Sequence, residues 1–186
     1  AVSLGEMIRV FITSAEYTLN RMDFPKAMAR MSSSIRGGNA ASLKELCDRW
    51  FEEELKAHIA AKAVARARQH QLQGETVVVL SASTQFAVRP VAEHLGMEYG
   101  CTELAIEDGA LTGGLVGEAC FGEGKLIWGR RIAERHGFTL DDCAFYTDSA
   151  SDLPLFEAVG RPVAVNPDAK LKALARKNGW PIESFY

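Results

Sequence analysis

Four residues in the second half of the chain have side chains suited to binding a phosphate group and a divalent cation: Ser81, Lys125, Asp148 and Asp152. Ser81 directly follows an apolar run at residues 77–80, and Lys125 follows a glycine-rich turn. A hydroxyl with nearby backbone N–H groups and an ammonium group suit phosphate oxygens, while closely spaced carboxylates suit Mg²⁺, which prefers hard oxygen ligands. We therefore predict a phosphate site with a magnesium ion, provided that the fold brings these residues together.

Each of these residues also has a plainer interpretation. Ser81 alone is more often a turn hydroxyl, and Lys125 alone is more often a surface lysine. Ser149 followed three residues later by Asp152 resembles a capping box, so these two side chains could simply begin a helix. The hypothesis of a site therefore depends on the elements that position the four residues.

These elements alternate between short apolar strands and helices. Residues 144–147 are apolar and aromatic, which predicts a buried strand that ends at Asp148. The other predicted elements are strands over residues 77–80, 99–102 and 162–165, helices over residues 86–95, 122–136, 153–159 and 168–177, and an Asp-Gly hairpin over residues 106–112 at the margin of the sheet. This alternation predicts an α/β fold with a doubly wound parallel, Rossmann-like sheet, in which ligands bind outside the carboxyl ends of the strands.

Residues 1–73 have a helical pattern throughout and differ from the rest of the chain. Asp23 before Phe24-Pro25 predicts the start of a helix that runs to about residue 34, and further helices are predicted over residues 42–55 and 60–73. The pattern changes at Gly74. We therefore predict an all-helical unit at residues 1–73 and an α/β unit at residues 74–186.

Composition and charge exclude several classes of protein. The chain has 186 residues and a net charge of −3, which favours neither nucleic acid nor an anionic membrane as a general partner. The four cysteines lie far apart without a Cys-x-x-Cys pair, which favours reduced thiols in a cytoplasmic protein over a disulfide framework or a zinc site. No signal peptide is evident, and the apolar runs are too short to span a bilayer.

The order of these motifs resembles the haloacid dehalogenase superfamily, most of whose members are phosphatases. Ser81, Gly124-Lys125 and the segment Asp148 to Asp152 match its second, third and fourth motifs. The chain is most similar to the phosphoserine-phosphatase-like branch, which has a helical cap ahead of the second motif. On this resemblance, residues 1–73 form the cap with its connecting helices, and residues 74–186 form most of the phosphatase core.

The resemblance also implies a role for each site residue. Ser81 and Ala82 would bind the phosphoryl group, and Lys125 would steady that group together with the nucleophile. Asp148 would ligate Mg²⁺, and Asp152 would support the metal through its water ligands. The remaining two residues of this segment would have a supporting role, namely Ser149 and Ser151, the second of which stands where phosphoserine phosphatases tend to carry asparagine. The substrate implied is a small phosphorylated metabolite such as phosphoserine or histidinol phosphate.

One motif of the superfamily is absent from the sequence. Members begin with a strand that ends in Asp-x-Asp, whose first aspartate attacks phosphorus and whose second acts as general acid and base, and these 186 residues contain no Asp-x-Asp. That strand lies in the middle of the sheet, so its absence would leave backbone groups unpaired on both neighbouring strands. We expect the nucleophile strand to lie outside this chain, and the chain alone to be inactive and poorly stable.

Three functions remain open from the sequence. The first is a Mg²⁺-dependent phosphomonoesterase that works through an aspartyl-phosphate, and the second is a catalytically inactive binding or regulatory module with the same pocket. The third, a nucleotide or flavin binder, is disfavoured because no glycine-rich fingerprint follows the strand at residues 77–80. Arg30 or Arg36 could meet a substrate carboxylate, although either is more often a surface arginine.

Overall fold

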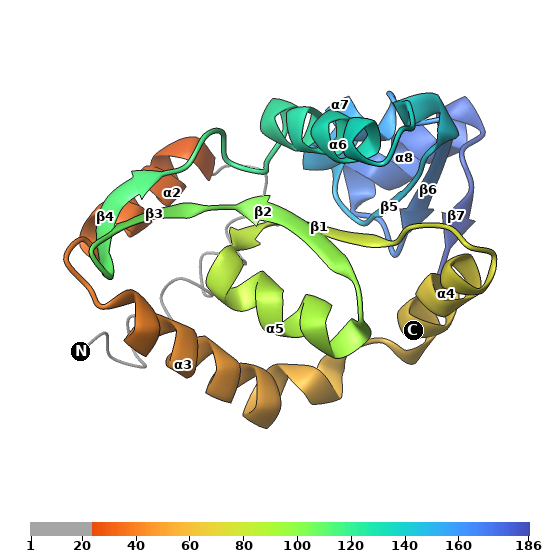
Figure 1. The fold of residues 1–186 in the computed structure, drawn as a ribbon. Coiled ribbons are helices and arrows are strands. Elements are labelled where there is room, and N and C mark those ends of the chain that lie inside the picture. The colour runs from red at the N-terminus through yellow and green to blue at the C-terminus, as the bar shows by residue number, and fades with distance from the viewer. Residues whose placement is uncertain (1–23) are drawn as a thin grey trace.

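A computed structural model describes residues 24–186 of the chain (Figure 1). The helices are α2 (Phe24–Ser34), α3 (Ala40–Trp50), α4 (Ala61–Leu72), α5 (Gln85–Leu95), α6 (Glu123–Arg135), α7 (Leu153–Phe156) and α8 (Ala169–Asn178). The strands are β1 (Val78–Thr84), β2 (Glu98–Thr102), β3 (Leu104–Glu107), β4 (Ala110–Leu115), β5 (Ala144–Thr147), β6 (Arg161–Val165) and β7 (Ile182–Glu183). Within the described part of the chain, no helix has the length and apolar character needed to cross a membrane.

The region before β1 is helical, as predicted, over the residues that the structure describes. Helix α2 has the predicted bounds, whereas α3 begins two residues earlier than expected, because Asn39 caps it by accepting a hydrogen bond from the backbone N–H of Ser42 at 2.9 Å. Helix α3 continues into a π-helical turn at Phe51–Leu55. The predictions for residues 1–23, including a cap at Asp23, lie outside the described residues.

The strands after Gly74 confirm the predicted α/β fold with parallel pairing. Strand β1 pairs with β2 in parallel, and β5, β6 and β7 form a parallel sheet in that order. Among the described strands, β1 and β5 each have a neighbour on one side only. The described strands therefore form two separate parallel sheets with open edges at β1 and β5, which agrees with the expectation that the strands on either side of an absent central strand are left unpaired.

Strands β3 and β4 form the predicted Asp-Gly hairpin, but not as part of a parallel sheet. Asp108 and Gly109 both have positive φ, at 48° and 78°, which is the conformation of a type I′ turn. The hairpin is a two-stranded antiparallel sheet of its own and packs against α2 (Figure 1). The expectation that it lies at the margin of the parallel sheet is therefore wrong.

Helix α6 connects the two parallel sheets. It packs against β1 and β2 and also contacts α7 and the turn before it. Helix α5 covers the β1 and β2 pair and in turn contacts α3, while α8 packs against β6 (Figure 1). Because α6 carries Lys125 in its first turn, this arrangement places that lysine between the ends of β1 and β5.

Two separate hydrophobic clusters support these layers. The first joins α3, α5 and the hairpin through Ala40, Cys47, Phe86, Leu104 and Leu111. The second joins the turn after β5 with α7, β6 and α8 through Ala150, Phe156, Ala164, Leu171 and Ala175. Phe156 is fully buried and packs edge-on against Trp180, with ring centroids 5.1 Å apart. Burial of these apolar side chains is the main source of stability for both parts.

Polar contacts hold helix α4 against the second sheet. Arg66 forms an ion pair with Glu183 of β7 at 2.8 Å, and His70 Nε2 lies 2.8 Å from the hydroxyl of Tyr146 on β5. The other ring nitrogen of His70 contacts Glu75, which also pairs with Arg161 at 3.2 Å. Residues ahead of β1 are thereby tied to the strand that carries the Asp148 segment.

Candidate active site

A buried ion pair lies at the centre of the site. The ammonium of Lys125 lies 2.7 Å from Oδ1 of Asp152 and donates to its Oδ2 at 2.8 Å. The two residues keep only 6% and 4% of their surface exposed. Removing two charges from water costs free energy unless each charge finds hydrogen-bonding partners. The stability of this ion pair therefore depends on the groups around it.

Those surroundings complete the hydrogen bonding of the Asp152 carboxylate. The Thr147 hydroxyl donates to Oδ2 at 2.6 Å, and the Ser151 hydroxyl donates to Oδ1 at 3.4 Å. Ser149 caps the short turn at residues 150–152, accepting from the backbone N–H of Ser151 at 3.3 Å. The capping interpretation is therefore confirmed for Ser149 but wrong for Asp152, because the Asp152 side chain points to Lys125 instead of back to residue 149.

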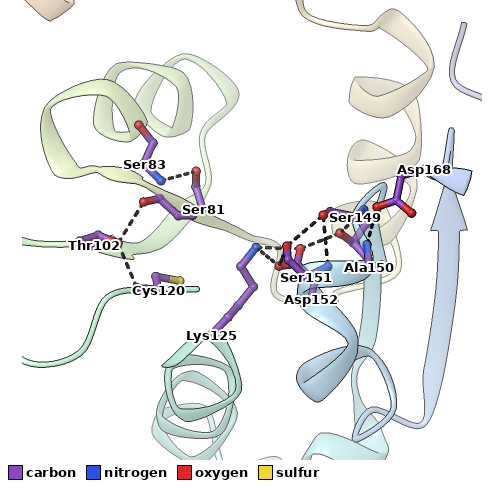
Figure 2. A network of polar contacts seen from close by, with 12 residues as sticks. Ser81, Ser83, Thr102, Cys120, Lys125, Ser149, Ala150, Ser151, Asp152 and Asp168 are labelled. Carbon is purple, nitrogen blue, oxygen red and sulfur yellow. Dashed lines mark hydrogen bonds and ion pairs between the residues drawn. The ribbon is translucent and has the colours of Figure 1, made fainter. Parts of the chain in front are cut away.

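The glycines before Lys125 allow α6 to begin close to the chain that precedes it. A Cβ on Gly124 would clash with the carbonyl oxygen of Ala119, and Gly122 caps the helix with a positive φ of 54°. The first turn of α6 can therefore pack against residues 119–121, which directs Lys125 towards Asp152 (Figure 2).

Ser81 lies inside β1. The sequence had suggested instead that it directly follows the strand. The strand continues through Thr84 because residues beyond Ser81 still pair with β2, with an irregularity in register between Ser81 and Thr84. The Ser81 hydroxyl accepts from the backbone N–H of Ser83 at 3.1 Å. Ser81 is therefore the middle residue of β1, and Ala82 follows it towards the carboxyl end of the strand. Figure 2 shows the Ser81 hydroxyl directed at the backbone of Ser83.

Thr102 connects the Ser81 segment to the chain that leads into α6. It is fully buried, its hydroxyl donates to the carbonyl of Ala82 at 3.0 Å, and the same oxygen accepts from the N–H of Cys120 at 2.9 Å. Figure 2 shows Thr102 between the two segments. Burial raises the pKa of the Cys120 thiol to about 12, so this cysteine is a neutral neighbour of the site at physiological pH.

Asp148 lies at the end of β5 and is the exposed carboxylate of the group. Its carboxyl group is nevertheless partly desolvated by the surrounding chain, which is the main reason that its pKa lies above the usual value. The charges of Asp152 and Asp168 also raise the pKa, while a hydrogen bond to its own backbone and the charge of Lys125 lower it. A carboxylate crowded by like charges gains from a nearby cation. Asp148 is therefore an exposed carboxylate that interacts with two like charges and with one cation, Lys125.

The carboxylates of this group differ in their freedom to bind a cation. Within residues 24–186, no group of three or more His, Cys, Asp or Glu side chains is placed to hold a metal ion. Mg²⁺ is usually held by one or two carboxylates and completes its shell with waters and substrate oxygens. Asp148 fits that requirement, whereas both oxygens of Asp152 are already engaged by Lys125, Thr147 and Ser151.

The structure thus brings together Lys125, Asp152, Ser149 and Ser151 by direct contacts. Asp148 is near enough to interact with the charges of Lys125 and Asp152, and Ser81 and Ala82 lie on the β1 segment that Thr102 joins to the chain before α6. Three participants were missed from the sequence: Thr102, Thr147 and Asp168. Thr147 directly precedes Asp148, so its place at the strand end was the available signal. The roles of Thr102 and Asp168 depend on contacts with distant segments, which sequence spacing does not show.

Comparison with known proteins places this geometry in a family. Residues 4–157 match the model of the haloacid dehalogenase-like hydrolases. A probable phosphatase of Mycobacterium tuberculosis is 36% identical over 156 residues, which are 83% of this chain and 54% of that protein. A phosphoserine phosphatase of the same organism is 33% identical over 167 residues, which are 89% of this chain and 54% of that protein. A histidinol-phosphatase of Neisseria meningitidis is 33% identical over 148 residues, which are 77% of this chain and 67% of that protein. The chain spans about half the length of the first of these curated relatives.

Solved structures show the same fold. A protein of unknown function from Bordetella pertussis Tohama I superimposes with a TM-score of 0.85 at 26% identity, covering 97% of this chain and 82% of that one. A phosphoserine phosphatase in the form of a phospho-aspartyl intermediate analogue superimposes with a TM-score of 0.69 at 21% identity. The match covers 96% of this chain and 80% of that one. At that level of identity the second match supports the fold alone.

Proposed function

The chain belongs to the haloacid dehalogenase-like hydrolases, and from that premise we propose that its protein is a Mg²⁺-dependent phosphomonoesterase that works through an aspartyl-phosphate. The observation that carries the proposal is the buried Lys125–Asp152 pair, with contacts of 2.7 and 2.8 Å. A protein that needed only a packed core would gain as much from apolar side chains at these positions. A lysine fixed close to Asp148 instead supplies positive charge where a phosphoryl group would bind.

Each residue has a role in this proposal. The Ser81 hydroxyl and the backbone N–H groups near Ala82 would bind phosphoryl oxygens, and Lys125 would stabilise the negative charge that builds up during transfer. Asp152 would hold the Lys125 ammonium in place. Asp148 would hold Mg²⁺, which would neutralise phosphate charge when bound. Ser149 and Ser151 would support this loop, and Asp152 would reach the metal only through its waters.

The proposal needs a nucleophile that residues 24–186 do not provide. Ser81 has no base beside it in the described contacts, and the sequence contains no Asp-x-Asp. We infer that a further strand pairs with the open sides of β1 and β5 and carries the aspartates. Its first carboxylate would attack phosphorus as the ester P–O bond breaks, and the second would protonate the leaving alkoxide. Water would then hydrolyse the aspartyl-phosphate and release phosphate.

Two features support a small phosphorylated metabolite as the substrate. Relatives with about a third of their residues identical are named phosphoserine phosphatase and histidinol-phosphatase. Residues 1–73 would act as a cap over the site, where Arg30 and Arg36, both exposed, could contact a substrate carboxylate. An amino acid or amino alcohol phosphate is therefore the substrate class that we propose.

Phosphate release from phosphoserine, histidinol phosphate and a reactive aryl phosphate would test the proposal in the full-length protein. Turnover should require Mg²⁺, disappear with EDTA and return when Mg²⁺ is added back. Asp148→Asn should abolish most turnover while the protein stays folded by thermal melting. Asp141→Asn, which changes an exposed acid away from the site, serves as the control. Phosphate binding without turnover in a well-folded protein would instead favour a non-catalytic binding module.

A further inference from the structure

Asp168 makes hydrogen bonds both to its own helix, α8, and to the backbone of residues 148–150, which directly follows the Asp148 side chain. Its carboxylate accepts from the N–H of Ala150 through Oδ2 and from the N–H of Leu171 through Oδ1, both at 2.7 Å. Its own backbone N–H donates to the carbonyl oxygen of Asp148, also at 2.7 Å. Figure 2 shows the Asp168 carboxylate directed at Ala150.

Only one of these bonds is needed to cap helix α8. The bond to Leu171 is an ordinary N-cap contact, in which a side-chain oxygen accepts from the N–H three residues on. Asn39 caps α3 with a single bond of this type, to Ser42. The two bonds to the Asp148 segment are additional, because they join α8 to a loop that is 18 residues away in the sequence. A simple capping role therefore does not account for them.

The chain before Asp168 is itself held in place. Asn166 has a positive φ of 43°, which is uncommon for a residue with a side chain, and its Oδ1 accepts from the N–H of Phe185 at 3.2 Å. Pro167 follows and fixes its own φ. Because β5 and β6 are neighbours in register, the bend after β6 brings Asp168 directly beside the end of β5. Asp168 thus reaches the Asp148 segment from a rigid position.

We propose that Asp168 is a positioning residue that fixes the backbone of residues 148–150 and thereby aims the Asp148 carboxylate at the metal. Both contacts lie on the backbone, at the carbonyl of Asp148 and at the N–H two residues later. Between them the two peptide units that join Asp148 to Ala150 have little freedom to rotate. Insofar as it concerns Mg²⁺, this inference rests on the proposed function.

Two substitutions separate this role from capping. Asp168→Ser keeps a good N-cap group for α8 but is too short to reach Ala150 as well. Asp168→Asn keeps one oxygen for Leu171 and turns a donor towards the Ala150 N–H. Asp142→Asn is the matched control, because the Asp142 carboxylate accepts from the Thr139 N–H at 2.9 Å in a local turn away from the site.

The first readout is amide hydrogen exchange in the full-length protein. In the wild type, the amide of Ala150 should exchange as slowly as the first bonded amides of α8. In both Asp168 variants it should lose protection, while amides in the middle of α8 keep theirs. An Ala150 amide that exchanges freely in the wild type, or that stays protected in both variants, would overturn the inference without reference to activity.

The second readout is Mg²⁺ binding, followed as the rise in melting temperature with Mg²⁺ concentration. The half-saturating concentration should increase by about 10- to 100-fold in the Asp168 variants, the range seen when partners of metal ligands are changed. Excess Mg²⁺ should restore most of the turnover, because Asp148 itself remains. An unchanged half-saturating concentration would refute the link to the metal. If wild-type protein binds no Mg²⁺ at all, the proposed function fails, and amide exchange alone decides the role of Asp168.

Discussion

Replacing Lys125 by methionine should destabilise the protein far more than replacing an exposed lysine that makes a similar ion pair. Both side chains of the Lys125–Asp152 pair are more than 90% buried, and the ammonium contacts both carboxylate oxygens. Removing it leaves the Asp152 charge with only the hydroxyls of Thr147 and Ser151 as partners. Loss of one partner of a buried pair costs about 3–5 kcal/mol.

The expected change in melting temperature follows from that free energy. A protein of 150–250 residues loses about 2–4 °C per kcal/mol, so Lys125→Met should lower the melting temperature by about 6–20 °C. Lys56→Met provides the control, because Lys56 pairs with Glu52 at 2.9 Å on an exposed helical surface. Exposed pairs of this kind contribute about 0.3–0.5 kcal/mol, so the control should lose only about 1–2 °C.

A double-mutant cycle identifies the cause of the loss. Lys125→Met and Asp152→Asn should each destabilise the full-length protein, because each leaves one buried charge unpaired. Together they should cost less than the sum of the two single changes, with a coupling free energy of about 1–3 kcal/mol from denaturant unfolding. Losses that simply add, or a Lys125→Met protein as stable as Lys56→Met, would refute the argument that this pair is buried and mutually dependent.

Three further predictions follow from the same contacts. Lys125→Arg should keep the protein folded but leave kcat at least about tenfold below the wild type with KM little changed, because a planar guanidinium cannot replace a point donor in a tight site; full recovery of kcat would contradict this. Thr102→Val should destabilise the protein by about 1–3 kcal/mol in denaturant unfolding, since Ala82 and Cys120 each lose a buried partner, whereas Thr102→Ser should restore most of that stability. The thiols of Cys47, Cys101 and Cys120 should react with iodoacetamide at pH 8 only after unfolding, because burial raises their pKa values to about 11, 12 and 12; rapid labelling of any of the three in folded protein would show that the site region opens.

Local patterns predicted the elements well where neighbouring residues determine them. The apolar run at 144–147 became β5 with the predicted bounds, and the Asp-Gly pair formed the hairpin turn. Gly96 ended α5 in the left-handed conformation that the helix pattern indicated. At these positions backbone preference and hydrophobic periodicity give the same result as the tertiary structure.

The site was harder to predict wherever distant segments meet. Asp152 resembled a capping residue because Ser149 is close in sequence, yet its carboxylate is held by Lys125, 27 residues away. Strand β1 extends past Ser81 because β2 provides partners for it, which no local pattern reveals. Each of these features depends on which segments pack together, and spacing alone does not specify that.

The most direct test of the proposed mechanism compares two polypeptides in one assay. The first is the 186-residue chain, and the second is the same chain extended by a segment with a buried strand that ends in Asp-x-Asp. The account predicts Mg²⁺-dependent phosphate release from an aryl phosphate by the extended polypeptide alone, together with a higher melting temperature, because the new strand pairs with β1 and β5. Changing the first aspartate of the added motif to asparagine should keep that melting temperature and remove the turnover. Phosphate release by the 186-residue chain at the rate of the extended one would contradict the account.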